Sequence, residues 1–331
     1  MFSPWSRRRG LLSAGVVGVV GAVLTLSACA SAEPAPPGGG AVTVATAFGD
    51  VSVPSAPKRV VALGWGDAEV ALTLGVQPVG AADWLPVGGD GVATWVPRDR
   101  RYTTEPKLLG TKEVDVEQVA ALEPDLILDT RASGDRARYD QLAALGVPVV
   151  GIPRGGEAYR TTWQDQLTLI GRALGKPAEA AKVRADLEAK FQRAAAANPG
   201  FAGRTMVTGA RTGAGYGAYV NGGSRVEFME KLGFQQSPKV QALAGKSFSV
   251  PVSAERMDLF DADLTVISLI GATADQVTGD PLFQSVPSVK AGHFVVLTDR
   301  TISQAFASGT PLGLSYAIDR VVPLLAQARA R

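Results

Sequence analysis

Apolar and polar positions follow two alternating patterns along the chain from Arg59 onward. Short, almost wholly apolar runs have the length of buried strands, and between them lie stretches whose apolar residues recur at helical spacing. Strands are predicted at residues 60–63, 78–81, 125–128 and 147–150, and helices at 67–74, 116–122 and 139–145. Gly75 and Gly146 follow two of these helices, where glycine ends a helix easily. This alternation predicts parallel strands with helices on both faces of the sheet.

A nearly unbroken helical pattern occupies the middle of the chain. Gly175-Lys176-Pro177 divides it, and the piece that follows, residues 178–197, is rich in Ala, Glu and Lys and has no strand signal. After Gly203 the strand–helix alternation resumes and continues to Leu325. One long helix between two such blocks indicates a spine that joins two lobes. The predicted organisation is an N-terminal lobe at 42–160, a helical region with the spine at 161–198 and a C-terminal lobe at 199–331.

The two blocks repeat one another. Residues 114–128 and 252–266 carry matching Val, Glu, Asp and Leu at a constant offset of 138 positions (252 minus 114), and their apolar positions match as well. The predicted fold class is therefore α/β, with two Rossmann-like lobes joined by one long α-helix. The ligand cleft is expected between the lobes, where the carboxyl ends of their strands face each other.

The N-terminal residues have the pattern of an export signal. Three arginines, Arg7 to Arg9, precede an uncharged run at 11–28. Leu26-Ser27-Ala28-Cys29 resembles a bacterial lipobox, which implies a signal peptide at 1–28 and a lipid on Cys29. The alternative is a single transmembrane anchor, since the run is just long enough to span a bilayer. The arginines fit export by either the twin-arginine or the ordinary secretory route. Residues 29–41 are predicted to be a disordered tether.

Charge and composition exclude several classes of protein. Lys and Arg number 33 and Asp and Glu 31, so removal of the three signal arginines leaves 30 minus 31, or about −1. A net charge this close to zero gives no sign of the basic surface that binds nucleic acid. Cys29 is the only cysteine, which excludes a disulfide framework. His293 is the only histidine and stands at a predicted turn or strand edge. Zinc or manganese sites need several histidine and carboxylate ligands, and hydrolases with a histidine relay need a nucleophile motif that the chain lacks. Neither an enzyme nor a metal site is therefore expected.

Several stretches carry a specific order and spacing. They lie at residues 59–63, 74–80, 117–127 and 145–149 in the first block and at 252–255, 262–263, 280–283 and 289–294 in the second. In this order they resemble the substrate-binding lipoproteins of iron–siderophore ABC transporters, of the ferrichrome- and ferric-citrate-binding type. The resemblance implies a monomer, lipid-anchored on the extracytoplasmic face of the cell membrane, that passes a ferric siderophore to an ABC permease. The alternative is a haem- or cobalamin-binding protein of the same fold.

Binding of a ferric siderophore calls for particular side chains. The ligand is bulky, oxygen-rich and often anionic, so arginine guanidinium groups and aromatic faces suit it. Because the siderophore fills the coordination sphere of its iron, no metal ligand from the protein and no resident cofactor is expected. The candidates lie just past predicted strand ends or near the glycine-rich loop 213–217: Trp65, Trp84, Arg131, Arg154, Arg211, Tyr216, Tyr219, Arg225 and Arg300. An apparent insertion at 86–104, which contains Trp95, is expected to form a flap over the cleft.

Glu117 and Glu255 occupy equivalent points of the repeat. Each stands in the first turn of a predicted short helix, behind a predicted N-cap, Asp115 or Ser253. There the helix dipole stabilises an acid by roughly 0.3–1 kcal/mol. The family resemblance implies a second role, in which one glutamate per lobe docks onto arginines of the permease. The two interpretations are compatible.

Overall fold

The computed structural model describes residues 40–329, except residues 86 and 112. Cys29, the predicted signal peptide and nearly all of the predicted tether lie outside the described residues. Residues 39–331 belong to one compact unit, so the predicted lobe boundaries at 160 and 199 stay predictions. Within the described part of the chain, no helix is both long and apolar enough to cross a membrane.

The first part of the chain forms a hairpin and a parallel sheet. Strands β1 (Val42–Thr46) and β2 (Gly49–Val53) pair antiparallel. The sheet has the order β5-β4-β3-β6-β7 and all its pairs are parallel, as the alternation predicted. Its strands are β3 (Val60–Ala62), β4 (Gly80–Ala82), β5 (Lys107–Leu109), β6 (Leu126–Leu128) and β7 (Val149–Val150). The helices between them are α1 (Asp67–Thr73), η1 (Arg98–Arg100), α2 (Val116–Ala120) and α3 (Arg136–Ala143).

The strand order creates a topological switch point. The chain builds outward from β3 through β4 to β5, then crosses to the other side of β3 for β6 and β7. The segments that leave β3 and β6 therefore diverge, and a crevice opens at the carboxyl ends of these two strands. In open α/β sheets such a crevice is where ligands bind.

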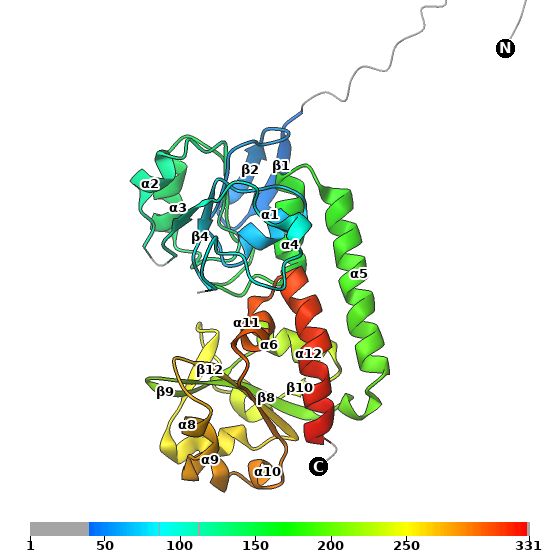
Figure 1. The fold of residues 1–331 in the computed structure, drawn as a ribbon. Coiled ribbons are helices and arrows are strands. Elements are labelled where there is room, and N and C mark those ends of the chain that lie inside the picture. The colour runs from blue at the N-terminus through cyan, green and yellow to red at the C-terminus, as the bar shows by residue number, and fades with distance from the viewer. Residues whose placement is uncertain (1–39, 86, 112, 330–331) are drawn as a thin grey trace, which may run out of the picture. The chain divides into compact units, whose positions relative to one another are not determined.

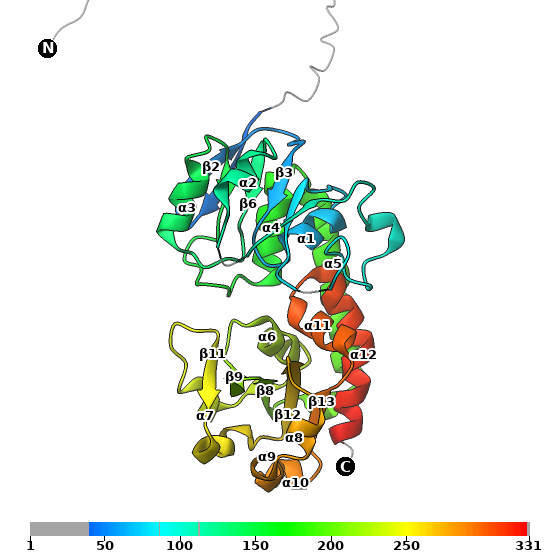
Figure 2. The same ribbon diagram turned by 60° about the vertical axis from the view of Figure 1, so that its left-hand side comes forward.

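The helical middle of the chain breaks where the sequence predicts. Helix α4 (Trp163–Ala173) and helix α5 (Pro177–Ala196) flank Gly175, which has a φ of 69°, and Pro177 opens α5. A left-handed φ suits glycine, and proline suits the first turn of a helix. Helix α12 (Pro311–Arg329) lies beside α5, as Figures 1 and 2 both show.

The second sheet is mixed. Its order is β11-β9-β8-β12-β13, with β10 also paired to β8. Its strands are β8 (Thr205–Thr212), β9 (Gly215–Tyr219), β10 (Gln235–Gln236), β11 (Ser249–Val252), β12 (Leu264–Ile270) and β13 (Phe294–Leu297). The remaining elements are η2 (Pro199–Phe201), α6 (Ser224–Lys231), α7 (Pro238–Gln241), η3 (Ala254–Phe260), α8 (Asp275–Thr278), α9 (Pro281–Ser285), α10 (Pro287–Lys290) and α11 (Arg300–Ser308). Figure 2 shows α8, α9 and α10 gathered at one end of this region.

Two expectations for this second region are wrong. Strand β9 runs antiparallel to both β8 and β11, whereas the alternation predicted parallel pairing throughout. The segment predicted as a glycine-rich loop is a hairpin, with Thr212 paired to Gly215. Gly215 has a φ of 130°, which lets the chain reverse tightly at this point. The helix-length crossover that parallel strands require is therefore absent between β8 and β9.

The internal repeat has a structural counterpart. Helix α2 and strand β6 begin at residues 116 and 126, and η3 and β12 begin 138 positions later, at 254 and 264. The repeated aspartate before each strand performs the same task. Asp125 accepts hydrogen bonds from the backbone N–H groups of Lys58 and Arg59, ahead of β3, and Asp263 accepts one from Thr205 N, at the start of β8. Each aspartate thus fixes the register of two neighbouring strands.

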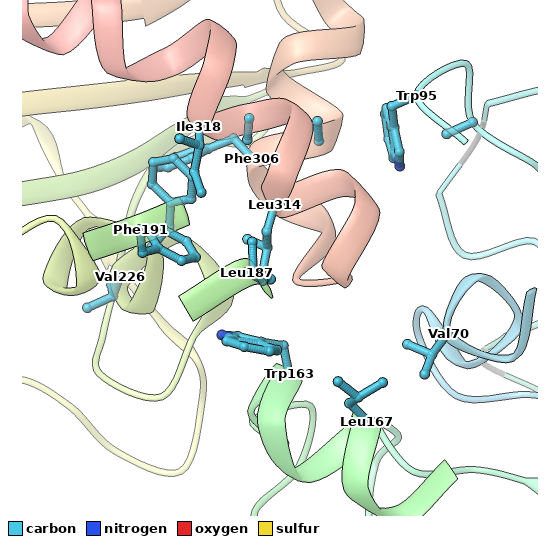
Figure 3. Packing of buried hydrophobic residues seen from close by; sticks show 14 of the residues in the cluster. Val70, Trp95, Trp163, Leu167, Leu187, Phe191, Val226, Phe306, Leu314 and Ile318 are labelled. Carbon is cyan, nitrogen blue, oxygen red and sulfur yellow. The ribbon is translucent and has the colours of Figure 1, made fainter. Parts of the chain in front are cut away.

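The core contains large side chains from elements far apart in sequence. Trp163 on α4, Phe191 on α5 and Phe306 on α11 are fully or almost fully buried, and Figure 3 shows them converging with Leu314 and Ile318 of α12. Burial of each such side chain stabilises the fold by roughly 1.5–3 kcal/mol.

Trp95 does not lie in a flap over a cleft. Its side chain is only 8% exposed, and its Nε1–H donates to the Glu69 carboxylate at 3.0 Å. Its ring also lies 6.2 Å from that of Tyr316 on α12. The insertion is held down because its tryptophan buries a large apolar surface and finds a buried acceptor for the indole N–H.

Candidate ligand-binding site

A cavity of about 680 Å³ lies at the switch point of the first sheet. Residues that follow β3, β4 and β6 line one side, and residues from the ends of β9, β12 and β13 and from α6 and α11 line the other. This volume falls within the usual range for small-molecule sites. Of the sequence-predicted candidates, the cavity brings together Trp65, Trp84, Arg131, Tyr219, Arg225 and Arg300.

A buried aspartate shapes the crevice behind the cavity. Asp67 begins α1, is fully buried, and accepts hydrogen bonds from Gly64 N at 3.1 Å and from the backbone N–H and hydroxyl of Thr130. The amide of Gln166 donates to it as well, at 2.6 Å. Burial raises the pKa of the Asp67 carboxyl, and these hydrogen bonds oppose the rise. Asp67 therefore ties the ends of β3 and β6 to α4.

Gly64 is needed where the two strands meet. A Cβ at this position would lie 2.4 Å from the Asp67 carboxylate and 2.8 Å from the backbone nitrogen of Arg131. No side chain fits in that space, because one of these neighbours is backbone, which cannot turn aside. The close approach brings Trp65, the next residue, to the cavity wall.

Arg131 lies in the wall of the cavity, but its guanidinium group is already bonded. Nε donates to the Thr161 carbonyl at 2.9 Å, and Nη1 and Nη2 donate to the carbonyls of Ser308 and Gly309 at 3.0 Å each. The residue is 4% exposed, and burial lowers its pKa. Arg131 therefore joins the end of β6 to the start of α4 and to the α11–α12 turn, instead of presenting an open fork to a ligand.

One side of the cavity is aromatic. The rings of Trp65 and Trp84 stack 5.4 Å apart at an interplanar angle of 16°, and Tyr159 lies 4.3 Å from Trp65. Phe248 meets Trp65 edge-on and stacks on Tyr219, which lies on the opposite side, at the end of β9. Tyr159 and Phe248 are not among the residues predicted from the sequence. Neither directly follows a strand: Tyr159 lies well along the loop after β7, and Phe248 precedes β11.

The other side is basic. Arg225 on α6 places its guanidinium carbon 4.3 Å from the ring centre of Tyr219, and its buried Nε has no hydrogen-bond partner among the described residues. Arg300, at the start of α11, also lines the cavity. Among the described lining residues there is no Asp, Glu or Lys, so the charged groups that line the cavity are arginines. A buried donor without a partner, such as Arg225 Nε, favours a ligand that supplies a hydrogen-bond acceptor.

Arg211 and Tyr216 lie away from the cavity for a geometric reason. Successive side chains of a strand point to opposite faces, so on β9 Tyr216 and Tyr219 face opposite ways. Tyr216 packs against Phe260 and Phe283. Arg211 pairs with Tyr216 across the hairpin, and its guanidinium carbon lies 5.1 Å from the centre of the Tyr216 ring. Both therefore belong to the face opposite Tyr219.

Arg154 is also outside the cavity. It lies on the loop after β7, where Nη2 forms an exposed ion pair with Asp50 on β2 at 2.7 Å. The described residues contain no cluster of three His, Cys, Asp or Glu side chains placed to hold a metal ion. His293 lies in the turn before β13, as predicted.

A family model for periplasmic binding proteins matches residues 60–301, which include both sheets and most of the residues that line the cavity. The chain belongs to this family.

Proteins of known sequence and structure agree with the family assignment. Among curated proteins of Bacillus subtilis (strain 168), the "Probable siderophore-binding lipoprotein YfiY" is 28% identical over 300 residues, which cover 82% of this chain and 86% of that protein. The "Fe(3+)-citrate-binding protein YfmC" is 28% identical over 250 residues, or 74% of each chain. The crystal structure of a periplasmic solute binding protein from Mycobacterium smegmatis superposes with a TM-score of 0.74 at 28% identity, and covers 88% of this chain and 99% of that one.

In this periplasmic binding protein, Glu117 and Glu255 are both exposed. Asp115 caps α2 as predicted, since its carboxylate accepts from Gln118 N at 3.0 Å. Ser253 occupies the N-cap position of η3 but makes no capping hydrogen bond there. Instead, hydrogen bonds from the backbone N–H of Glu255 and from the Ser253 side chain lower the pKa of the Glu255 carboxyl. The carboxylates of both glutamates are therefore open to solvent at equivalent points of the repeat.

Proposed function

We propose that this chain is an extracytoplasmic solute-binding lipoprotein that captures a ferric siderophore and delivers it to an ABC permease for iron uptake. One observation carries the proposal most directly: a cavity with stacked tryptophans on one side, arginines on the other, and no acid among its described lining residues. The names of the relatives, which refer to siderophore and Fe(3+)-citrate binding, point to the same class of ligand.

The two sides of the cavity suit the two parts of a ferric chelate. Its oxygen-rich, anionic surface would accept hydrogen bonds from Arg225 and Arg300, which also supply the compensating charge. Its organic shell would lie against Trp65 and Trp84, which offer flat apolar faces. The siderophore already saturates the iron, so the protein recognises the outside of the complex and leaves the iron–oxygen bonds intact. Release to a permease then requires no chemistry at the metal.

Tryptophan fluorescence provides a direct test, because two of the five tryptophans line the cavity. The protein is titrated with ferric citrate, ferrichrome, ferric catecholates, haem and cobalamin. We expect quenching by at least one ferric chelate, with a Kd between about nanomolar and about micromolar. Tight binding of haem or cobalamin with no ferric chelate bound would overturn the siderophore assignment in favour of the alternative ligands.

Substitution of a cavity arginine tests the basic side. Arg225→Ala should weaken binding of an anionic ferric chelate by about 1.5–3 kcal/mol, the range for hydrogen bonds to charged groups. Arg154→Ala is the matched control, because that arginine pairs with Asp50 outside the cavity. A neutral chelate of similar shape should lose less than the anionic one. Equal losses for both chelates would mean that Arg225 acts through packing alone.

Permease docking is assigned to Glu117 and Glu255. Both are exposed and neither lines the cavity. The double replacement by alanine should leave chelate affinity unchanged and reduce uptake sharply, because two charge-assisted contacts to permease arginines are lost together. Glu179→Ala is the control, since Glu179 is likewise an acid in the first turn of a helix. If the double variant is stable, binds the chelate and still supports full uptake, the docking role is refuted. The two glutamates then act only on the dipoles of their helices.

Anchoring to the membrane is assigned to a lipid on Cys29. Only a thiol at this position can take the lipid, and Cys29 is the only cysteine in the chain. Cys29→Ala should therefore yield an unlipidated precursor that no longer partitions into the detergent phase. Unchanged partitioning would instead indicate the transmembrane anchor.

A further inference from the structure

Tyr159 has an unusual backbone conformation in the loop between β7 and α4. Its φ is 57°, a left-handed value that is uncommon for any residue other than glycine and rare for a bulky one. Its backbone N–H donates to the Ala132 carbonyl at 2.8 Å, and its ring lies 4.3 Å from that of Trp65. Contacts on the cavity side therefore hold the strained conformation in place. Backbone strain of this kind concentrates at ligand clamps and switch regions.

Arg160, the next residue, reaches the segment that precedes β11. Its Nη2 donates to the Ser247 carbonyl at 2.7 Å and to the Gly245 carbonyl at 3.4 Å. Its Nη1 pairs with the Glu157 carboxylate, and the side chain is only 11% exposed. The guanidinium group of Arg160 thus holds the backbone of residues 245–248, which we call the strap.

The strap ends in an aromatic residue that connects the two sides of the cavity. Phe248 meets the rings of Trp65 and Tyr159 edge-on, with centroids 6.2 and 6.4 Å away, and stacks on Tyr219 of β9 at 6.3 Å. The N–H of Val220 donates to the Phe248 carbonyl at 3.2 Å, which ties this end of the strap to β9.

The rest of the strap has little to hold it besides Arg160. Gly245, Lys246 and Ser247 are exposed, and a Cβ placed on Gly245 would meet no atom within 4 Å. Segments with few buried contacts and exposed backbone open at low free-energy cost. Apart from its Phe248 end, the strap therefore depends for its closed position on one side chain, that of Arg160 in the loop between β7 and α4.

We propose that the strap is a gate over the aromatic side of the cavity, and that Arg160 is its latch. The proposal rests on the proposed function, in that it takes the cavity as the ligand site. In the closed position Phe248 joins ring contacts from both sides, so a ligand cannot pass this side until those rings separate. Because the acceptors are neutral backbone carbonyls, the latch does not depend on the side chains of the strap or on pH near neutrality. Arg160 thus acts as a positioning residue.

The gate is first tested without ligand, by hydrogen–deuterium exchange on the full-length protein. Arg160→Ala should raise the amide exchange of the buried Val220, whose N–H donates to the Phe248 carbonyl, by about 10-fold or more, because the strap then opens more often. Arg160→Lys should give an intermediate increase, since lysine retains one donor group. Arg154→Ala, in the same loop but paired with Asp50, should change nothing. Unchanged exchange of the Val220 amide in Arg160→Ala, with normal thermal unfolding, would overturn the proposal.

Stopped-flow tryptophan fluorescence then measures the gate in action, with ferric citrate and ferrichrome as probes. A gate limits both entry and exit, so Arg160→Ala should raise the association and dissociation rates together, each by about 10-fold, and change Kd much less. A faster dissociation matched by an equal loss of affinity would make Arg160 an ordinary contact and overturn the gate. If the probes bind with rates unchanged by Arg160→Ala, the gate fails and the proposed function stands. If no ferric chelate of the titration panel binds but exchange of the Val220 amide responds to the variant, the proposed function fails and the gate stands.

Discussion

Arg131 offers a sharp test, because the sequence and the structure assign it different roles. The sequence predicts a ligand contact, whereas the structure shows a buried guanidinium group bonded to three backbone carbonyls, those of Thr161, Ser308 and Gly309. Arg131→Met keeps the apolar stem and removes the donors. Three carbonyls in the interior then lose their partner, and each unsatisfied group costs about 1–3 kcal/mol.

The expected loss of stability is smaller than that sum. Burial lowers the pKa of Arg131, so the folded state already carries a desolvation cost that the substitution removes. We expect a net destabilisation of about 3–5 kcal/mol, which is a large part of the roughly 5–15 kcal/mol that stabilises a typical native protein. Urea unfolding followed by circular dichroism measures it as a lower midpoint, by about 1 M or more if the slope is about 3 kcal/mol/M.

Arg225→Ala is the comparison that decides between the two roles. It should weaken chelate binding and leave the urea midpoint nearly unchanged, the reverse of the pattern expected for Arg131→Met. If Arg131→Met unfolds within about 1 kcal/mol of wild type yet loses chelate affinity 10-fold or more, the structural role is refuted and Arg131 is a ligand contact, as the sequence predicts.

Three further outcomes follow from the structure. Burial raises the pKa of the Glu69 carboxyl from 4.5, so its contribution to stability falls as pH rises through the raised pKa. Wild type should therefore gain stability relative to Glu69→Gln as pH falls from neutrality toward 4.5, and a pH-independent difference in urea unfolding would contradict this. Arg211→Ala should leave chelate affinity within about 2-fold of wild type, since the side chain faces away from the cavity; a larger loss in fluorescence titration would refute that placement. Asp125→Asn should cost about 1–2 kcal/mol in urea unfolding, because the strand-anchoring hydrogen bonds lose their charged acceptor, and an unchanged midpoint would count against that role.

Much of the fold could be predicted because its signals are local. The apolar runs and helical spacings located β3, α1 and β6, and Gly175 with Pro177 located the break between α4 and α5 to within a residue or two. The constant offset of 138 residues predicted that two regions share one arrangement, and the matching element starts agree with it. Periodicity reports which residues are buried in a regular element, and that information survives in any tertiary context.

The site was predicted only in part. Trp65, Trp84, Tyr219, Arg225 and Arg300 do meet at one cavity, because the carboxyl ends of parallel strands gather at one edge of a sheet. Tyr159 and Phe248 were missed, because one lies deep in a loop and the other precedes its strand. The distance of a residue from a strand end in the sequence does not show whether a loop folds that residue back to the cavity.

What the sequence by itself determined, then, is the class of fold, the approximate places of many of its helices and strands, and the types of side chain available for a ligand. The tertiary structure decided how those side chains are used. Tyr216 and Tyr219 are chemically alike and three residues apart, yet only Tyr219 faces the cavity, because the glycine-rich segment folds into a hairpin. Arg131 and Arg225 are both arginines, yet only Arg131 has its guanidinium group bonded to backbone carbonyls brought from distant parts of the chain. Strand parity and long-range hydrogen bonds arise only when segments far apart in sequence pack together, so local pattern cannot supply them.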